Sequence, residues 1–261
     1  MSRPSLFARN RATRLKILVT NDDGIQSQGI IILAKVLKDV GDVFVIAPDR
    51  EKSATAHSLT LHRPLRVEKI KKDFYAVDGT PADCVHLAVN GILPEGPQLV
   101  VSGINKGPNL GNDITYSGTV SAAFEGTLLG IPSFAISLAA RSQFKFITAA
   151  RFAARVARYV IKEGLPKDTF LNVNVPNLDE KEVKSYRITR QGRYHVHGNQ
   201  AVEKVDPRGR KYYWIGGGTL VFDRGGETDY EAVSNGSISI TPLHIDLTSY
   251  GSIQRLKKWK L

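Results

Sequence analysis

The sequence contains very little cysteine, with a single residue, Cys84, in a chain of 261. One cysteine cannot form an internal disulfide, which excludes the class of secreted proteins held together by disulfides. The sequence also has no run of about 18 or more apolar residues, which excludes a membrane-spanning helix of ordinary length. We therefore expect a cytoplasmic protein with no membrane partner, in which Cys84 is buried in a helix and chemically inert.

Acidic residues are absent from both ends of the chain, and positive charge is concentrated there. The formal net charge is +11, and nine of the cations lie in residues 1–16 and 252–261, which contain no acid. The body between these segments is close to neutral. A large basic face of the kind that binds nucleic acid is therefore not expected, and we predict no stable nucleic-acid partner.

The turn after the first apolar run lacks the Gly-x-Gly-x-x-Gly pattern that lets a dinucleotide pyrophosphate approach a helix. It reads Asn21-Asp22-Asp23-Gly24, and its two acids would repel a pyrophosphate. A cofactor-binding oxidoreductase is disfavoured for this reason. A second alternative to an enzyme of phosphate chemistry is a nucleotide sensor or RNA-binding protein, to which the basic ends lend slight support.

Short apolar runs alternate with helical patterns up to about residue 176. The runs are rich in β-branched residues and predict buried strands at 16–20, 43–47, 99–102, 133–138 and 170–175. Helices are expected near 28–40, 80–90, 118–129 and 146–163. Gly130 and Gly164 should end the last two, and Thr80 should cap the second. This alternation predicts an α/β fold with a doubly wound, mostly parallel sheet.

After about residue 176 the pattern changes to isolated strand-like pieces joined by loops rich in glycine and charge. These pieces lie at 186–189, 212–215 and 237–240, and a short helix is expected at 251–260. We interpret them as hairpins, which commonly pair with another subunit. The expected organisation is a basic extension over 1–15, an α/β catalytic core over 16–176, and a hairpin-rich C-terminal region over 177–261 that packs on the core and on a partner subunit.

Polar residues follow three of the predicted strands where each ends. Asp22 and Asp23 follow the first strand, Ser53 comes shortly after the second, and Asn105 follows the third. In a parallel sheet these ends meet at one edge, where ligands bind. Adjacent carboxylates there repel each other without a cation, and oxygen donors suit Mg²⁺, Mn²⁺ or Ca²⁺ better than zinc. The structural alternative is that Asp22 caps the next helix and Asp23 forms a turn with Gly24.

Hydroxyl groups and a glycine occur at the start of one predicted helix, as Ser117, Gly118 and Thr119. Free backbone N–H groups and the positive end of a helix favour an anion such as phosphate. The structural alternative is that Ser117 simply caps the helix. A cation site and an anion site at the same sheet edge together indicate phosphoryl chemistry.

The chain resembles the SurE (survival protein E) family of nucleotidases. The matching segments occur in the family's order between residue 17 and about residue 244: ILVTNDDGI, APDREKSATAHSLT, GTPADCV, VVSGINKGPNLGNDITYSGTVSAAFEG, LNVNVP and SITPLH. One departure is SAT at 53–55, where many members have SG. Ser53 is retained, but the departure puts the loop geometry in doubt.

The resemblance implies a Rossmann-like core, a swapped or protruding C-terminal hairpin region, and a homodimer or homotetramer. It also implies a hydrolase of the 5′-nucleotidase type, which converts nucleoside 5′-monophosphates, and also 3′-monophosphates, to nucleoside and phosphate. Some members act on short polyphosphate. The resemblance further implies that the reaction depends on one divalent cation per subunit, Mg²⁺ or Mn²⁺, with Ca²⁺ able to replace it in a crystal.

The resemblance also assigns roles to particular residues. The expected metal ligands are Asp22, Asp23, Ser53 and Asn105. The expected phosphate contacts are Asn109, Ser117, Gly118 and Thr119, and the expected catalytic residues are Asp22, Asp23 and Asn109. The sequence leaves open whether Asp22 is a base, a nucleophile or a ligand only.

Three histidines allow further alternatives. His57 is close enough in sequence to Ser53 to reach the site, and either a catalytic or a supporting role is open to it. His195 and His197 would share one face of a strand and could bind a metal. Because no third ligand lies near them in sequence, we expect them to be exposed loop residues.

Overall fold

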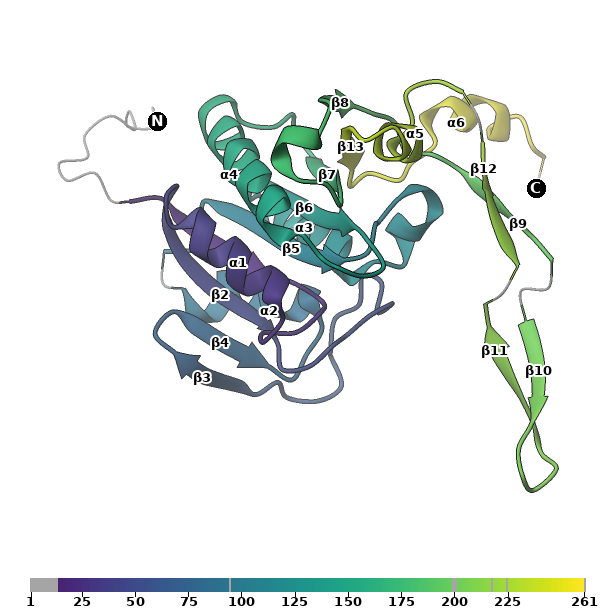
Figure 1. The fold of residues 1–261 in the computed structure, drawn as a ribbon, viewed down its shortest axis with the longest axis horizontal. Coiled ribbons are helices and arrows are strands. Elements are labelled where there is room, and N and C mark those ends of the chain that lie inside the picture. The colour runs from purple at the N-terminus through teal and green to yellow at the C-terminus, as the bar shows by residue number, and fades with distance from the viewer. Residues whose placement is uncertain (1–13, 94, 199–200, 217, 224, 261) are drawn as a thin grey trace.

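The computed structural model describes residues 14–93, 95–198, 201–216, 218–223 and 225–260, so most of the expected basic extension lies outside the described residues. At its centre is a nine-stranded sheet in the order β3-β4-β2-β1-β5-β6-β7-β13-β8 (Figure 1). Five parallel strands form its middle: β1 (Lys16–Thr20), β2 (Asp42–Pro48), β5 (Leu99–Lys106), β6 (Ser133–Ala139) and β7 (Thr169–Pro176). The predicted α/β fold with a mostly parallel sheet is confirmed.

The strand order reverses beside β1. From β1 the chain passes to β2 and on to the edge strand β3 (Val67–Lys71) and to β4 (Phe74–Val77) between β3 and β2. It then returns to the other side of β1 as β5. The carboxyl ends of β1 and β5 therefore flank the point where the order changes direction. Open α/β sheets bind their ligands at such a point.

Helices cover both faces of the sheet. Figure 1 shows α1 (Gln28–Leu37) and α4 (Phe146–Glu163) in front of it and α2 (Pro81–Leu87) and α3 (Gly118–Leu128) behind it. Side chains of β1 alternate accordingly, because Ile17 and Val19 join the buried cluster under α1 and α4, whereas Leu18 joins the cluster under α2 and α3.

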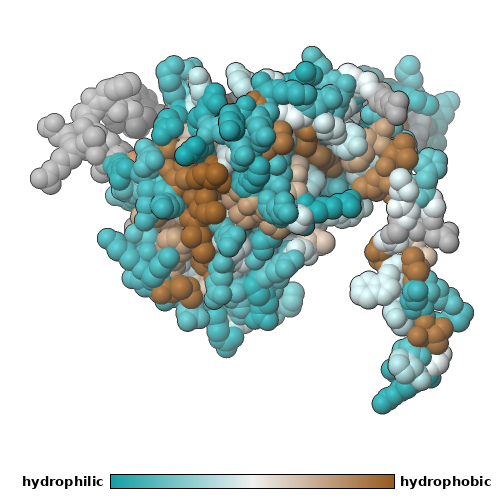
Figure 2. Space-filling view, viewed as in Figure 1, coloured by the Kyte–Doolittle hydropathy of each residue, from teal (hydrophilic) through white to brown (hydrophobic). Residues whose placement is uncertain are grey.

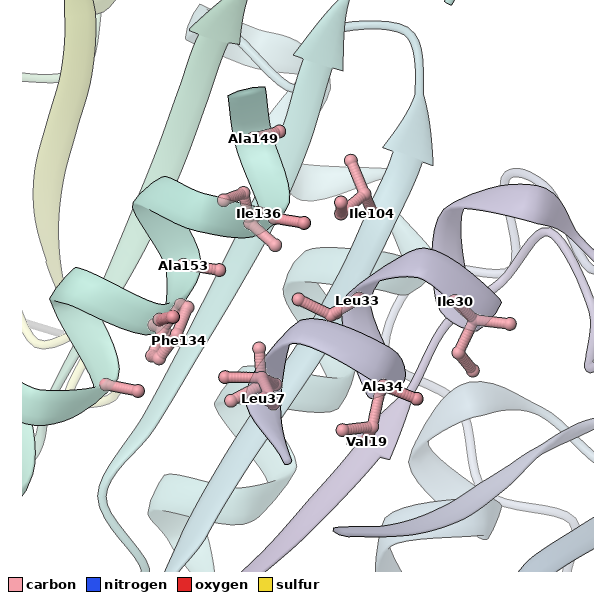
Figure 3. Packing of buried hydrophobic residues seen from close by; sticks show 14 of the residues in the cluster. Val19, Ile30, Leu33, Ala34, Leu37, Ile104, Phe134, Ile136, Ala149 and Ala153 are labelled. Carbon is pink, nitrogen blue, oxygen red and sulfur yellow. The ribbon is translucent and has the colours of Figure 1, made fainter. Parts of the chain in front are cut away.

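Tight packing under α1 and α4 forms the larger part of the core. Figure 3 shows Leu33 and Leu37 of α1 and Ala149 and Ala153 of α4 gathered above the strands, near Phe134. All five of these side chains are fully buried. The small alanines of α4 allow that helix to lie close to the sheet, which fixes the strand ends on which a site can be built.

The helix ends follow the predicted capping residues. Thr80 accepts from the backbone N–H of Asp83, whose carboxylate accepts in return from the backbone of Thr80. This arrangement is a capping box. Ser117 caps α3 by accepting from Val120 N. Gly164 ends α4 with a positive φ of 75°, which a residue without a side chain adopts at little cost.

The hairpin interpretation of the C-terminal region is wrong for two of its strands. β8 (Tyr186–Ile188) and β13 (Ile238–His244) pair in parallel with each other, and β13 joins the main sheet antiparallel to β7. Ile238 and Ile240 of β13 enter the buried cluster under α1 and α4, so burial of apolar area favours this placement over a free hairpin. The division of the chain at about residue 176 stays a prediction.

The other C-terminal strands form two antiparallel ribbons that we call the arm. β9 (Tyr194–His197) pairs with β12 (Thr219–Phe222), and β10 (Ala201–Val205) pairs with β11 (Lys211–Ile215). In Figure 1 the arm extends away from the sheet, with β10 and β11 farthest out. Beyond it come α5 (Asp229–Ser234) and α6 (Tyr250–Leu256), and the latter confirms the expected terminal helix. Among the described helices, none has the length and apolar composition needed to cross a membrane.

Replacement of Gly29 by alanine should test how closely α1 packs on β5. A Cβ at Gly29 would lie 2.2 Å from the carbonyl oxygen of Ile104, so the helix must move away from the sheet. We expect Gly29→Ala to lower the free energy of unfolding by about 1–3 kcal/mol, as measured by urea denaturation. The control is Gly91→Ala, where no heavy atom lies within 4 Å of the new Cβ. Equal unfolding free energies for the two variants would contradict this packing.

Candidate active site

A cavity of about 360 Å³ lies at the carboxyl ends of β1 and β5, where the strand order reverses. All four residues expected to hold a metal line it, together with two of the residues expected to contact phosphate: Asp22, Asp23, Ser53, Asn105, Asn109 and Ser117. They come from the segments after β1 and β2, from the end of β5 and the loop after it, and from the start of α3. The topology therefore brings together groups that are far apart in sequence.

Asp22 is buried, with 5% of its surface exposed. Burial raises its pKa to about 6, while a hydrogen bond from Thr119 lowers it and the charge of Asp23 raises it. The Thr119 hydroxyl donates to Asp22 Oδ1. The capping alternative is wrong for Asp22, because α1 begins at Gln28 and its N-cap is Ser27. The raised pKa shows that the negative charge of this carboxylate is not fully compensated by its neighbours.

Asp23 is held by the end of β5. The backbone N–H of Lys106 donates to Asp23 Oδ2 over 3.0 Å. Burial raises the pKa of Asp23, and this hydrogen bond opposes the rise. The two adjacent acids therefore have different partners, one in α3 and one in β5, and both carry a charge that burial makes costly.

Asn105 and Ser53 complete the set of oxygen donors. Asn105 Nδ2 donates to Gly107 O over 3.0 Å, which leaves its amide oxygen as the atom suited to a cation. Ser53 is exposed, and its hydroxyl donates to Glu51 Oε1 over 2.6 Å. β5 runs farther than predicted, to Lys106, with an irregularity in its pairing between Gly103 and Asn105. Such a bulge re-aims the side chains near it.

The residues present fit a hard divalent cation. Two carboxylates, a hydroxyl and an amide supply only oxygen, which suits Mg²⁺, Mn²⁺ or Ca²⁺. In the part of the chain that the structure describes, no group of three or more His, Cys, Asp or Glu residues is placed to hold a metal. In particular, His195 Nε2 lies 3.4 Å from Asp223 Oδ1, but His195 belongs to no such group.

Asn109 is fixed by a buried network of amides and hydroxyls. Its side chain donates to Ser137 Oγ over 2.8 Å, and its backbone N–H donates to Asn174 Oδ1 over 2.8 Å. Asn172 and Asn174 both donate to the carbonyl oxygen of Asn109. These partners come from β6 and β7, so two rigid strands fix the position of the Asn109 side chain at the cavity.

The start of α3 is pressed against Asp22. A Cβ at Gly118 would lie 2.9 Å from Asp22 Cβ, so this position leaves no room for a larger side chain. Ser117 lines the cavity, whereas the Thr119 hydroxyl is engaged with Asp22. Of the expected phosphate contacts at this helix end, Ser117 lines the cavity, whereas Gly118 and Thr119 do not. Gly118 packs against Asp22, and Thr119 donates to it.

Several residues that line the cavity were not selected from the sequence: Glu51, Ala54, Lys106, Pro108, Asp113 and Tyr116. They lie in the same segments as the selected residues, which is the only signal the sequence offers for them. Asp113 also accepts from Tyr194 Oη of the arm over 2.5 Å, and this hydrogen bond raises the pKa of Tyr194 to about 12. The base of the arm therefore contacts one wall of the cavity.

His57 does not line the cavity but lies beside α3. Its Nε2 atom is 2.8 Å from Glu125 Oε2, and its ring centre is 4.8 Å from that of Phe124. This placement favours a supporting role over direct catalysis. Cys84 is buried as predicted, and burial raises the pKa of its thiol.

Comparison with known proteins agrees with this geometry. Residues 17–198 match the family described as Survival protein SurE. A protein named 5′-nucleotidase SurE from Geobacter sulfurreducens is 56% identical over 248 residues, which cover 95% of this chain and 94% of the relative. The protein of the same name from Pelobacter propionicus is 54% identical over 246 residues, covering 94% of this chain and 99% of the relative.

A solved structure extends the match to three dimensions. The crystal structure of the SurE protein from Aquifex aeolicus aligns with a TM-score of 0.83 at 48% sequence identity, covering 93% of this chain and 98% of that one. Sequence and fold thus agree over almost the whole chain. The chain belongs to the SurE family.

Proposed function

We propose that this protein is a metal-dependent phosphomonoesterase that hydrolyses nucleoside 5′-monophosphates, and also 3′-monophosphates and short polyphosphate, releasing phosphate. The observation that carries the proposal is the cavity itself, because it joins the buried carboxylate of Asp22 and the partly buried carboxylate of Asp23 to the N-terminal end of α3. The first group suits a cation and the second an anion, as phosphoryl chemistry requires. The name 5′-nucleotidase carried by the relatives supports the same substrate class.

The cation would be held by Asp22, Asp23, Ser53 and Asn105, with one Mg²⁺ or Mn²⁺ per subunit. When bound there, it would neutralise phosphate charge and lower the pKa of a water molecule. The buried free thiol of Cys84 agrees with a reducing, cytoplasmic location, which forms part of the proposal.

The protein's own groups orient the phosphate and handle the proton. Ser117 and the positive end of α3 bind the phosphoryl oxygens, and Asn109 stabilises charge that develops on them. A water oxygen forms the new bond to phosphorus while the bond to the ribose oxygen breaks. Asp22 takes the proton of the attacking water, and the departing ribose oxygen takes a proton from solvent to give the nucleoside hydroxyl. The alternative is that Asp22 itself attacks phosphorus. Trapping of an aspartyl phosphate by acid quenching would show this mechanism and exclude direct attack by water.

The arm is the proposed contact for assembly into a homodimer or homotetramer. Large side chains of β11 are exposed although they are apolar or aromatic, with Tyr213 59%, Trp214 66% and Ile215 96% exposed. Figure 2 shows hydrophobic groups along this projection. Exposed apolar groups on a strand pair that contributes to no core commonly lie at a subunit interface.

Removal and replacement of the metal tests the proposed reaction. We expect EDTA to abolish phosphate release from a panel of nucleoside monophosphates, and Mg²⁺ or Mn²⁺ to restore it, because the charge of the phosphate must be neutralised for attack. Released phosphate is measured by a colorimetric assay. If no phosphate is released with any metal or any nucleotide, a nucleotide sensor built on the same fold would be favoured.

Substitution of either acid should reduce activity while the fold is retained. Asp22→Asn and Asp23→Asn each remove one charged donor without changing side-chain size, and we expect kcat/KM to fall by at least about 100-fold. The matched control is Asp49→Asn, because Asp49 lies at the same sheet edge but is exposed and pairs with Arg50. A variant at Asp22 or Asp23 that keeps most of its rate in saturating metal would remove that residue from the site.

A charge on the arm should disrupt assembly. Trp214→Glu places a carboxylate on the exposed face of β11, where burial against another subunit would be costly. We expect light scattering coupled to size exclusion to show a smaller particle than for the wild-type protein. The control is Tyr159→Glu on α4, which is equally exposed at 66% but lies outside the arm. An unchanged mass for Trp214→Glu would exclude this contact.

A further inference from the structure

The segment from residue 49 to residue 66, which we call the Ser53 loop, contains no helix or strand and is mostly exposed. Two backbone hydrogen bonds flank Ser53, one from Lys52 N to Asp22 O over 2.7 Å and one from Ala56 N to Tyr116 O over 3.2 Å. Ser53 lies five residues after the end of β2, farther from a preceding strand than any other expected metal ligand. Because an irregular loop samples many conformations, a ligand in it needs fixed points nearby to stay in place.

Beyond these two backbone contacts, the first side-chain fixed point is the buried carboxylate of Glu125 on α3, which is 4% exposed. Its Oε2 atom lies 2.8 Å from His57 Nε2 of the Ser53 loop, and its Oε1 atom lies 3.1 Å from His86 Nδ1 of α2. Burial raises the pKa of Glu125, but the hydrogen bonds and charges of the two histidines outweigh it and lower the pKa below its ordinary value. A buried carboxylate needs such partners, which makes loss of the His57 contact costly.

The second fixed point is Asp83, which is 3% exposed at the start of α2. Its carboxylate accepts from Thr60 N over 2.8 Å and from Thr60 Oγ1 over 2.6 Å. The cap residue of the same helix, Thr80, donates its hydroxyl to Ser58 O over 2.8 Å. Residues 57–60 of the loop are therefore tied to both α2 and α3.

Neither acid lines the cavity, and the contacts of both reach Ser53 through the loop that they hold. We propose that Glu125 and Asp83 are positioning residues that fix the Ser53 loop and thereby set the affinity of the site for its divalent cation. The inference rests on the proposed metal-dependent function, with Ser53 as a ligand. It also explains why α3 is central to the site, since one helix presents its N-terminal end to the cavity and, about two turns later, holds the loop through Glu125.

The test is the affinity of the full chain for Mn²⁺ without substrate, measured by electron paramagnetic resonance. Glu125→Gln keeps the shape of the side chain but removes the charge that holds the two histidines. We expect its Mn²⁺ Kd to rise about tenfold, the range found when a residue that supports a metal ligand is replaced. Phosphate release at saturating Mn²⁺ should stay within about threefold of wild type, because the groups that contact phosphate are unchanged. Glu163→Gln, at the exposed end of α4, is the matched control.

A second variant keeps the test decisive if Glu125→Gln does not fold. Thr60→Val removes one hydroxyl donor to Asp83 from a loop residue, and it too should weaken Mn²⁺ binding. An unchanged Kd in the folded variants, or a lower rate at saturating Mn²⁺ with an unchanged Kd, overturns the inference. A wild-type protein that binds no Mn²⁺ overturns it together with the proposed metal dependence. If the wild type binds Mn²⁺ but releases no phosphate, only the proposed function fails, and the affinities of the variants still decide this inference.

Discussion

Two carboxylates on neighbouring residues are held just after the end of a buried strand. Removing their negative charge from water costs free energy, and the arrangement of the candidate site follows from this cost. Asp22 and Asp23 both lose solvation, which raises both pKa values. Nearby negative charge adds to the rise, from Asp23 at Asp22 and from Glu51 at Asp23. The surrounding contacts offset only part of the cost, through the hydroxyl of Thr119 and the backbone N–H of Lys106. A site of this kind favours cation binding, because a bound cation removes the repulsion between negative charges in the folded chain.

The groups around the acids differ in how firmly the fold holds them. Asn109 is tied to β6 and β7 by a buried network, and Asp23 is tied to the backbone of β5. These positions follow directly from the sheet. Ser53 instead lies in an irregular loop. Two backbone hydrogen bonds flank it, at Lys52 and Ala56, and side-chain contacts farther along tie the loop to two helices. The candidate site thus combines a rigid part made by strand ends with one expected donor in a loop, which Glu125 and Asp83 would position in the role inferred for them.

The sequence was sufficient for the central strands and for the convergence of the site, because buried parallel strands are continuous apolar runs and their ends meet at one edge. It did not predict β3 and β4, since β3 is exposed along its whole length and β4 has only four residues. It misassigned β8 and β13 as hairpins, because the residues of a short strand do not indicate which strand it pairs with. The cavity walls at Lys106 and Tyr116 and the anchor at Glu125 depend on side-chain directions that no spacing encodes.

The arm has a consequence for how such a protein can change over evolutionary time. None of the described residues of β10 and β11 belongs to the buried hydrophobic clusters, and the two strands pair only with each other. Their sequence can drift, lengthen or shorten without disturbing the packing that holds the strand ends in register. Selection can therefore alter the subunit contact proposed for the arm while the chemical centre of the enzyme is inherited unchanged.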